Sequence, residues 1–297
     1  MIGAFYANIA RSTDDIESYI NSAFSAVNPD TGELSEYPSL VASSEGPHWE
    51  ESCSQEIARL CQGGFQDIKG TETMHFIHHR SIPKGRRPTY CRVVCTDHPQ
   101  KSQPRHVRYT VGGDRIHYPG NVSTTTAGLP TTKIIFNSTI STPGARFACF
   151  DIKDFYLNTH MTRYEYMRLH ISQVPKAIIM ELYNLWHLVH NNYLYVEICK
   201  GMYGLPQAGQ IANDELVIHL AKHGYHQCEH THGLFRHDTR PIAFSLVVDD
   251  FGVKYVGMFT ADILDTKVVD DEAEGNGTGF VAEESMGVLT LVVAMLG

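Results

Sequence analysis

The sequence predicts a mixed α+β fold, and three observations support this prediction. Residues 73–116 alternate apolar and basic side chains, a pattern typical of short, half-exposed strands. Residues 244–257, FSLVVDDFGVKYVG, join two β-prone runs through a short turn, which predicts an antiparallel hairpin. Residues 47–62 and 206–223 instead repeat their apolar side chains at helical spacing.

The first predicted helix begins at Pro47, because Trp49, Cys53, Ile57 and Leu60 are spaced four, four and three residues apart. Gly63 and Gly64 would end it. The preceding residues, 1–43, are polar and predict loose structure.

Residues 73–116 predict three or four strands, interrupted at Pro83–Gly85 and at Gln100–Pro104. Cys91, Val93 and Cys95 would share one face of a strand, which favours buried thiols. A zinc site that also uses nearby histidines is the alternative, but no second cysteine pair completes a ligand set at zinc-finger spacing.

Further along the chain, residues 124–140 predict a short helix and residues 146–152, RFACFDI, an apolar strand that ends at Asp151. Residues 175–188 begin with a proline and predict another helix. The helix predicted at 206–223 would end at Gly224 as its C-cap. Beyond residue 257 the chain becomes acidic and glycine-rich, which predicts disorder.

Charge is distributed unevenly along the 297 residues. The formal net charge is −9, yet residues 72–146 carry 11 basic and 3 acidic side chains. A basic segment inside an acidic chain is a candidate site for a polyanion. The side chains that could contact phosphate are Lys84, Arg86, Arg87, Lys101, Arg105, Arg108 and Arg115; a solvated basic face is the alternative.

Targeting signals are not evident in the sequence. No apolar stretch approaches the length of about 20 residues that crosses a bilayer. The first residues lack a basic leader with a long apolar core, and seven cysteines do not indicate a disulfide framework. We therefore expect an intracellular protein without a membrane partner; its oligomeric state stays open.

Three acids follow apolar strands. Asp249 and Asp250 end the first strand of the hairpin, and Asp151 ends the strand at 146–152. If the two strands are neighbours in one sheet, the carboxylates meet at one edge and offer oxygen ligands for Mg²⁺ or Mn²⁺. Such ions can promote an in-line phosphoryl transfer. The alternative is a solvated turn, since Asp and Gly are common turn residues.

The stretch KGMYGLPQAG, residues 200–209, places Gly-Leu-Pro-Gln before a predicted helix. The N-terminus of a helix favours phosphate, although Gly-Leu-Pro is also an ordinary loop.

Taken in order, these pieces resemble the reverse transcriptase domain of copia-type LTR retrotransposon polyproteins. The motifs that carry the resemblance are HWEESCSQEIARLCQG, RRPTYCRVVCTDHPQKSQPRHVRYTVGG, ARFACFDIKDFYLNTHM, GMYGLPQAG, HGYHQCEHTHGLF and SLVVDDFGVKY. Together they lie within residues 47–257. The resemblance implies a right-hand polymerase with an antiparallel palm sheet and fingers, acting on an RNA/DNA primer–template with dNTPs.

The resemblance also implies a role for each matching residue. Asp151, Asp249 and Asp250 would be the catalytic metal ligands. Tyr156 would exclude a 2′-hydroxyl by its bulk, and Gln207 would contact the nucleotide. Arg108 and Lys101 would hold the triphosphate. Val247 departs from the pattern, because many relatives have Tyr there.

The resemblance divides the chain into a variable segment (1–46), a fingers-like region (47–145), a palm-like catalytic region (146–257) and an acidic tail (258–297). Nothing after residue 261 resembles the rest of the palm, a thumb or a ribonuclease H domain, so we expect a truncated domain. One alternative is an inactive remnant that retains nucleic-acid binding. Another is a metal-dependent phosphohydrolase that uses the same acids.

Overall fold

The computed structural model describes residues 25–99, 101–152 and 154–257. It has a mixed α+β architecture with four α-helices and three β-sheets among these residues. The chain divides into two compact units, each built from two stretches of sequence. The first unit comprises the described residues of Met1–Asn121 together with Tyr156–Ala208. The second comprises the described residues of Val122–Phe155 and Gly209–Gly297.

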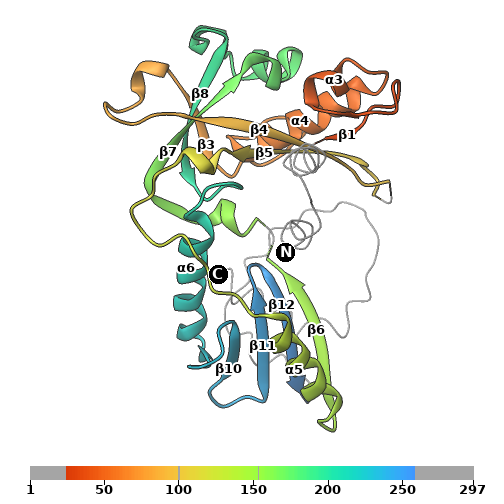
Figure 1. Ribbon diagram of the computed structural model, residues 1–297, viewed down its shortest axis with the longest axis vertical. Helices are drawn as coiled ribbons and strands as arrows, with labels where there is room; N and C mark the ends of the chain where they lie inside the picture. Colours follow the sequence, from red (N-terminus) through yellow and green to blue (C-terminus); the bar gives the residue numbers. More distant parts are fainter. Residues whose placement is uncertain (1–24, 100, 153, 258–297) are drawn as a thin grey trace, which may run out of the picture. The chain divides into compact units, whose positions relative to one another are not determined.

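The first unit contains a curled, mixed five-stranded sheet with the strand order β3-β8-β7-β4-β5 (Figure 1). Its strands are β3 (Met74–Ile77), β4 (Thr89–Asp97), β5 (Arg105–Val111), β7 (His160–His170) and β8 (Tyr193–Lys200). All neighbours are antiparallel except β4 and β7, which pair in parallel through Thr89 and Tyr90 only. The predicted strands of residues 73–116 are thus confirmed as three.

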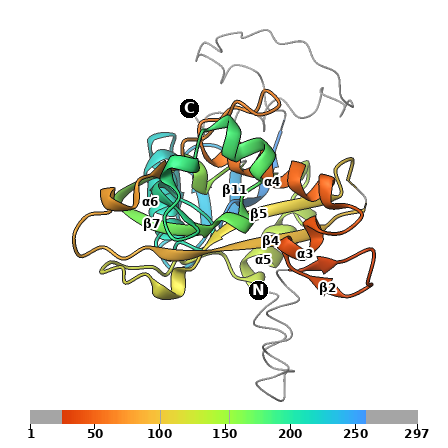
Figure 2. The same ribbon diagram turned by 90° about the horizontal axis from the view of Figure 1, so that it is seen from above.

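Helix α4 (Gly46–Leu60) packs on β5, and α3 (Tyr37–Val41) packs on α4 (Figures 1 and 2). The predicted face of α4 is confirmed, because Trp49, Cys53, Ile57 and Leu60 are each at most 1% exposed. Beyond the helix, Gly63 and Gly64 adopt positive φ angles of 77° and 88°, which suit a residue without a Cβ. On β4, the shared buried face of Cys91, Val93 and Cys95 is also confirmed.

Two expectations for the first unit need correction. In the segment 1–43, which was expected to be loose, residues 25–43 contain β1 (Ala26–Val27), β2 (Leu34–Ser35) and α3, and Tyr37 and Leu40 are buried. Residues 1–24 lie outside the described residues. Residues 175–188 do not form one α-helix. They contain a single π-helical turn, η5 (Lys176–Met180), and a 3₁₀ turn, η6 (Trp186–Leu188). Ile179, Met180 and Leu185 are buried in this segment.

Four short 3₁₀ turns also occur in the first unit. They are η1 (His79–Ser81), η2 (Gly113–Arg115), η3 (Tyr156–Asn158) and η4 (Ile171–Gln173).

The second unit contains a five-stranded antiparallel sheet with the order β6-β12-β11-β10-β9. Its strands are β6 (Ala145–Asp151), β9 (Tyr225–Gln227), β10 (Leu234–His237), β11 (Ile242–Val247) and β12 (Asp250–Val256). Stacked Phe235 and Phe244, with ring centroids 5.0 Å apart, lie in its core. The hairpin predicted at 244–257 is confirmed as β11–β12.

Two helices belong to the second unit. Helix α5 (Leu129–Ile140) lies against β6, β11 and β12, and Figure 1 shows it along one face of this sheet. Helix α6 (Ala208–Lys222) buries Ala212, Leu216 and Leu220 at i,i+4 spacing. Gly224 follows α6 with a φ of 77°, as expected of a C-cap glycine.

The sequence-based division into fingers and palm stays a prediction. The disorder predicted after residue 257 falls outside the described residues. Within the described part of the chain, no helix is both long and apolar enough to cross a membrane.

Candidate functional site

The strand register of the second unit brings the predicted acids together at one end of the sheet. β6 pairs with β12 so that Asp151 lies directly opposite Asp250. The backbone N–H of Ile152 donates to the carbonyl oxygen of Asp249 at 3.2 Å, which holds the turn residue beside the end of β6. The strands expected to be neighbours are neighbours, although about a hundred residues separate them in the sequence.

Directly opposite residues of an antiparallel pair point to the same face, with Cβ atoms about 5 Å apart. Asp151 and Asp250 are therefore a cross-strand pair of like charges, and both are exposed. Among the residues that the structure describes, no three His, Cys, Asp or Glu side chains are grouped so as to hold a metal ion. The geometry thus shows a carboxylate pair, and convergence of all three acids stays a prediction.

The turn that carries these acids is strained. Val247 pairs with Asp250, so that Val248 and Asp249 form a two-residue hairpin loop. Val248 has a φ of 63°, a value that a β-branched residue rarely adopts. Hairpin loops of this length normally place glycine, asparagine or aspartate where φ is positive. Strain of this kind is concentrated at functional sites, where the surrounding structure maintains it.

A second group of predicted residues is assembled within the first unit. The guanidinium of Arg108, on β5, lies 5.2 Å from the ring centroid of Tyr203. That ring in turn meets Tyr156 edge to face, with centroids 5.9 Å apart. Two residues predicted to contact a nucleotide are therefore joined through Tyr203, an aromatic residue of GMYGLPQ whose role the sequence alone did not reveal.

The GMYGLPQ loop is held tightly against its neighbours in the first unit. The N–H of Val111 donates to the carbonyl oxygen of Tyr203 at 2.8 Å. A Cβ on Gly204 would lie 2.1 Å from the oxygen of Val111, and one on Gly201 would lie 2.4 Å from that of Tyr156. Glycine is required at both positions because any side chain would collide with the backbone.

Gln207, the last residue of that loop, is completely buried. Among the residues that the structure describes, neither its Nε2 nor its Oε1 has a hydrogen-bond partner. A buried amide without partners costs about 1–3 kcal/mol, so such groups normally have a reason to persist. A polar ligand that reaches the amide would remove this cost.

Lys101 lies outside the group formed by Arg108, Tyr203 and Tyr156. It is exposed in the loop between β4 and β5, where its N–H donates to the carbonyl oxygen of His98 at 2.8 Å. It contributes to a groove of about 400 Å³ that also includes Arg59 and His106. Burial, aided by the positive charges of Arg108, Lys101 and others, lowers the pKa of His106 to about 4.

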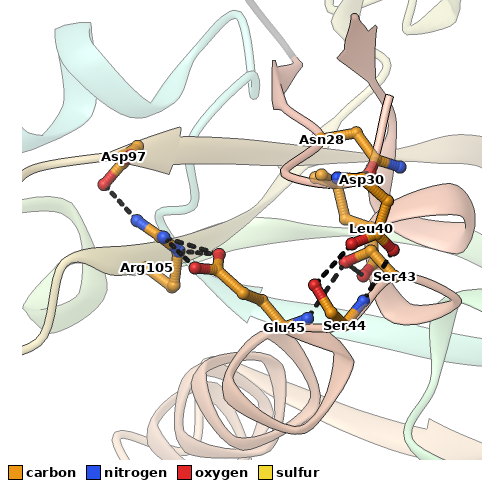
Figure 3. A network of polar contacts seen from close by, with 8 residues as sticks. All are labelled: Asn28, Asp30, Leu40, Ser43, Ser44, Glu45, Asp97 and Arg105. Carbon is orange, nitrogen blue, oxygen red and sulfur yellow. Dashed lines mark hydrogen bonds and ion pairs between the residues drawn. The ribbon is translucent and has the colours of Figure 1, made fainter. Parts of the chain in front are cut away.

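Not all of the basic segment is available for phosphate. Arg105 donates to Glu45 through Nε at 2.7 Å and to Asp97 through Nη1 at 2.5 Å (Figure 3). The bonds to Arg105 lower the pKa of the Glu45 carboxyl. Arg86 likewise contacts Glu165 at 2.7 Å. Arg86 and Arg105, which the sequence offered as phosphate contacts, serve internal ion pairs in this structure.

Comparison of the chain with protein-family models, with curated proteins and with solved structures finds no match.

Proposed function

We propose that this chain carries an RNA-directed DNA polymerase domain of the LTR-retrotransposon type, which transfers nucleotides from dNTPs to a primer 3′-hydroxyl. One observation carries the proposal. The β6–β12 register sets Asp151 opposite Asp250, and the backbone N–H of Ile152 donates to the carbonyl oxygen of Asp249. The order of the surrounding motifs along the chain supports the same assignment.

The acids suit hard divalent cations by their chemistry. Carboxylate oxygens are preferred ligands of Mg²⁺ and Mn²⁺, and a cation would turn the repulsion between Asp151 and Asp250 into attraction. Asp151, Asp249 and Asp250 would hold the ions. When bound, the ions would activate the primer hydroxyl and stabilise the leaving pyrophosphate.

The aromatic and basic group of the first unit suits the nucleotide. The guanidinium of Arg108 offers a fork of donors to a triphosphate. The Tyr156 ring, supported edge to face by Tyr203, supplies the bulk that would exclude a 2′-hydroxyl. The amide of Gln207, which has no hydrogen-bond partner in the described part of the chain, would bond the sugar and phosphate oxygens. Lys101 would add a further positive charge for the triphosphate.

Primer extension on an RNA template tests the proposal. The full chain should extend a DNA primer with dNTPs and Mg²⁺ or Mn²⁺, and Asp151→Asn or Asp249→Asn should abolish extension. Asp214→Asn is the matched control, because Asp214 is an exposed carboxylate of α6 that accepts a hydrogen bond from Gln210. Extension that survives either substitution would refute the role assigned to that acid.

Substrate selection provides an independent test. Tyr156→Val should increase the incorporation of ribonucleotides relative to deoxyribonucleotides, since the ring would no longer fill the space beside the 2′ position. Gln207→Met should raise the KM for dNTP more than it lowers kcat. An unchanged ribonucleotide ratio in Tyr156→Val would contradict the role of that ring.

One observation favours a second candidate, a nucleic-acid-binding domain without catalysis. The described residues provide no group of three metal-ligating side chains. Filter binding against salt discriminates between the two. Binding that weakens steeply with salt in a chain that fails to extend primers would favour this candidate. Template-independent hydrolysis of nucleotides would instead favour a phosphohydrolase.

A further inference from the structure

Helix α5 carries an apolar stripe that the described residues of the second unit leave largely exposed. Leu129, Phe136 and Ile140 are spaced seven and four residues apart, so they lie along one side of the helix. They are 60%, 44% and 83% exposed. The side of α5 that packs on the sheet is a different one, which buries Thr131 and Ile135. We call Leu129, Phe136 and Ile140 the α5 stripe.

The α5 stripe is held in a defined position. Phe136 stacks on Phe147 of β6 with ring centroids 4.1 Å apart. Lys254 of β12 donates to Ser138 at 2.6 Å and to Thr142 at 2.8 Å, which fixes the C-terminal half of α5 and the residue pair that follows. The exposed apolar side chains thus project from a helix that is anchored to the sheet. Covering such a surface is favourable because it removes apolar area from water.

The sequence supplies an occupant of matching character. Residues 286–296 read MGVLTLVVAML and contain no charged side chain. Eleven residues are about 16 Å long as a helix and longer when extended, comparable with the 12-residue α5. We propose that residues 286–296 cover the α5 stripe within the same chain.

The chain leaves the described region close to this surface. Val256, the last residue of β12, pairs with Ala145, which follows α5 after four residues. Residues 258–285 provide 28 residues between this point and the apolar segment, a length that easily reaches any part of α5. Proximity along the chain raises the effective concentration of the segment at the stripe.

Charge favours the same pairing. Lys133 is the one charged residue of α5, and it lies exposed on the side of the stripe. Glu283 and Glu284 come just before the apolar segment, and six acids precede them between residues 258 and 282: Asp262, Asp265, Asp270, Asp271, Glu272 and Glu274. The acidic residues before the apolar segment would be attracted to Lys133, and α5 carries no acid that would repel them. This attraction favours binding of the segment to α5 over binding to another apolar surface.

Hydrogen exchange of the full chain tests the proposal. Replacing Leu291 and Val293 by aspartate should release the segment and accelerate exchange of the α5 amides several-fold. Ile140→Asp should have the same effect from the other side of the contact. The matched control is Ile218→Asp, a substitution at a 59% exposed residue of α6, which should leave exchange of α5 unchanged.

The rival occupant is a second copy of the chain, and mass measurement by light scattering separates the two. A monomer whose α5 exchange responds to the Leu291/Val293 double substitution supports the proposal. Exchange of α5 that ignores that substitution overturns it, and so does protection of α5 that depends on protein concentration. None of these outcomes depends on polymerase activity, so the proposed function and this inference can fail separately.

Discussion

Asp151 and Asp250 face each other directly across the antiparallel pair β6–β12. Two exposed carboxylates in this position repel, by about 0.2–1 kcal/mol for a cross-strand pair of like charges. Asp250→Asn should therefore raise the free energy of unfolding slightly in low salt. The gain should shrink at 1 M salt, where charges are screened.

Urea unfolding at two salt concentrations measures this effect, with Asp214→Asn as the control. A loss of stability in Asp250→Asn at low salt would mean that the native carboxylate makes a favourable contact that outweighs the repulsion.

Val248 in the hairpin loop should be improved by glycine. Its φ of 63° places a branched side chain in a sterically poor region, at a cost of about 1–3 kcal/mol. Val248→Gly removes this cost. It also increases the conformational entropy of the unfolded chain, which lowers stability by about 0.5–1 kcal/mol. We expect a net rise in the urea midpoint.

The neighbouring Val247→Gly is the matched comparison, because Val247 lies in β11 and does not share the positive φ. It should lower the midpoint. Equal losses in both variants would show that the loop of Val248 carries no removable strain.

Arg105 should contribute to stability more than the exposed Arg115. Arg105 is bonded to both Glu45 and Asp97, and its side chain is 20% exposed. Arg115 is 65% exposed, and its Nε lies 4.0 Å from Oδ2 of Asp114, which is a long distance for an ion pair. Because exposed pairs contribute little, Arg115→Gln should leave the free energy of unfolding almost unchanged, whereas Arg105→Gln should lower it by about 1 kcal/mol.

Chemical denaturation compares the two substitutions directly. In Arg105→Gln the pKa of Glu45 should also rise, because its lowering arises chiefly from the hydrogen bond with Arg105. A larger loss from Arg115→Gln would contradict the network of Figure 3.

His106 should make the protein less stable in mild acid. Its folded-state pKa is lowered from 6.5 to about 4, first by burial and then by Arg108, Lys101, His98 and Arg59. Between these two pH values the unfolded chain binds a proton that the folded protein excludes, so stability falls as the pH drops from about 6.5 through about 4.

His106→Asn should flatten this part of the stability profile, measured by urea unfolding at closely spaced pH values. His117→Asn, at an exposed position after η2, serves as the control. A profile between pH 6.5 and 4 that is the same in His106→Asn as in the native chain would contradict the proton exclusion assigned to His106.

Local periodicity was enough to predict several elements. The buried face of α4, the shared face of Cys91 and Cys95, and the β11–β12 hairpin depend on residues two to four positions apart. Such spacings are fixed by the helix and strand geometry of the backbone. The helix predicted over residues 175–188 is present only as two short turns, and Ile179 and Met180 are buried in the first of them.

The sequence by itself therefore determined which residues are candidates for the proposed chemistry: three acids at strand ends, a glycine-rich loop ending in Gln207, and Arg108 in a basic segment. Only the tertiary structure decided which of them meet. It set Asp151 opposite Asp250, placed Tyr203 between Arg108 and Tyr156, and assigned Arg105 to Glu45. The physical reason is that strand register and long-range packing join residues distant in sequence, and no local period encodes those contacts.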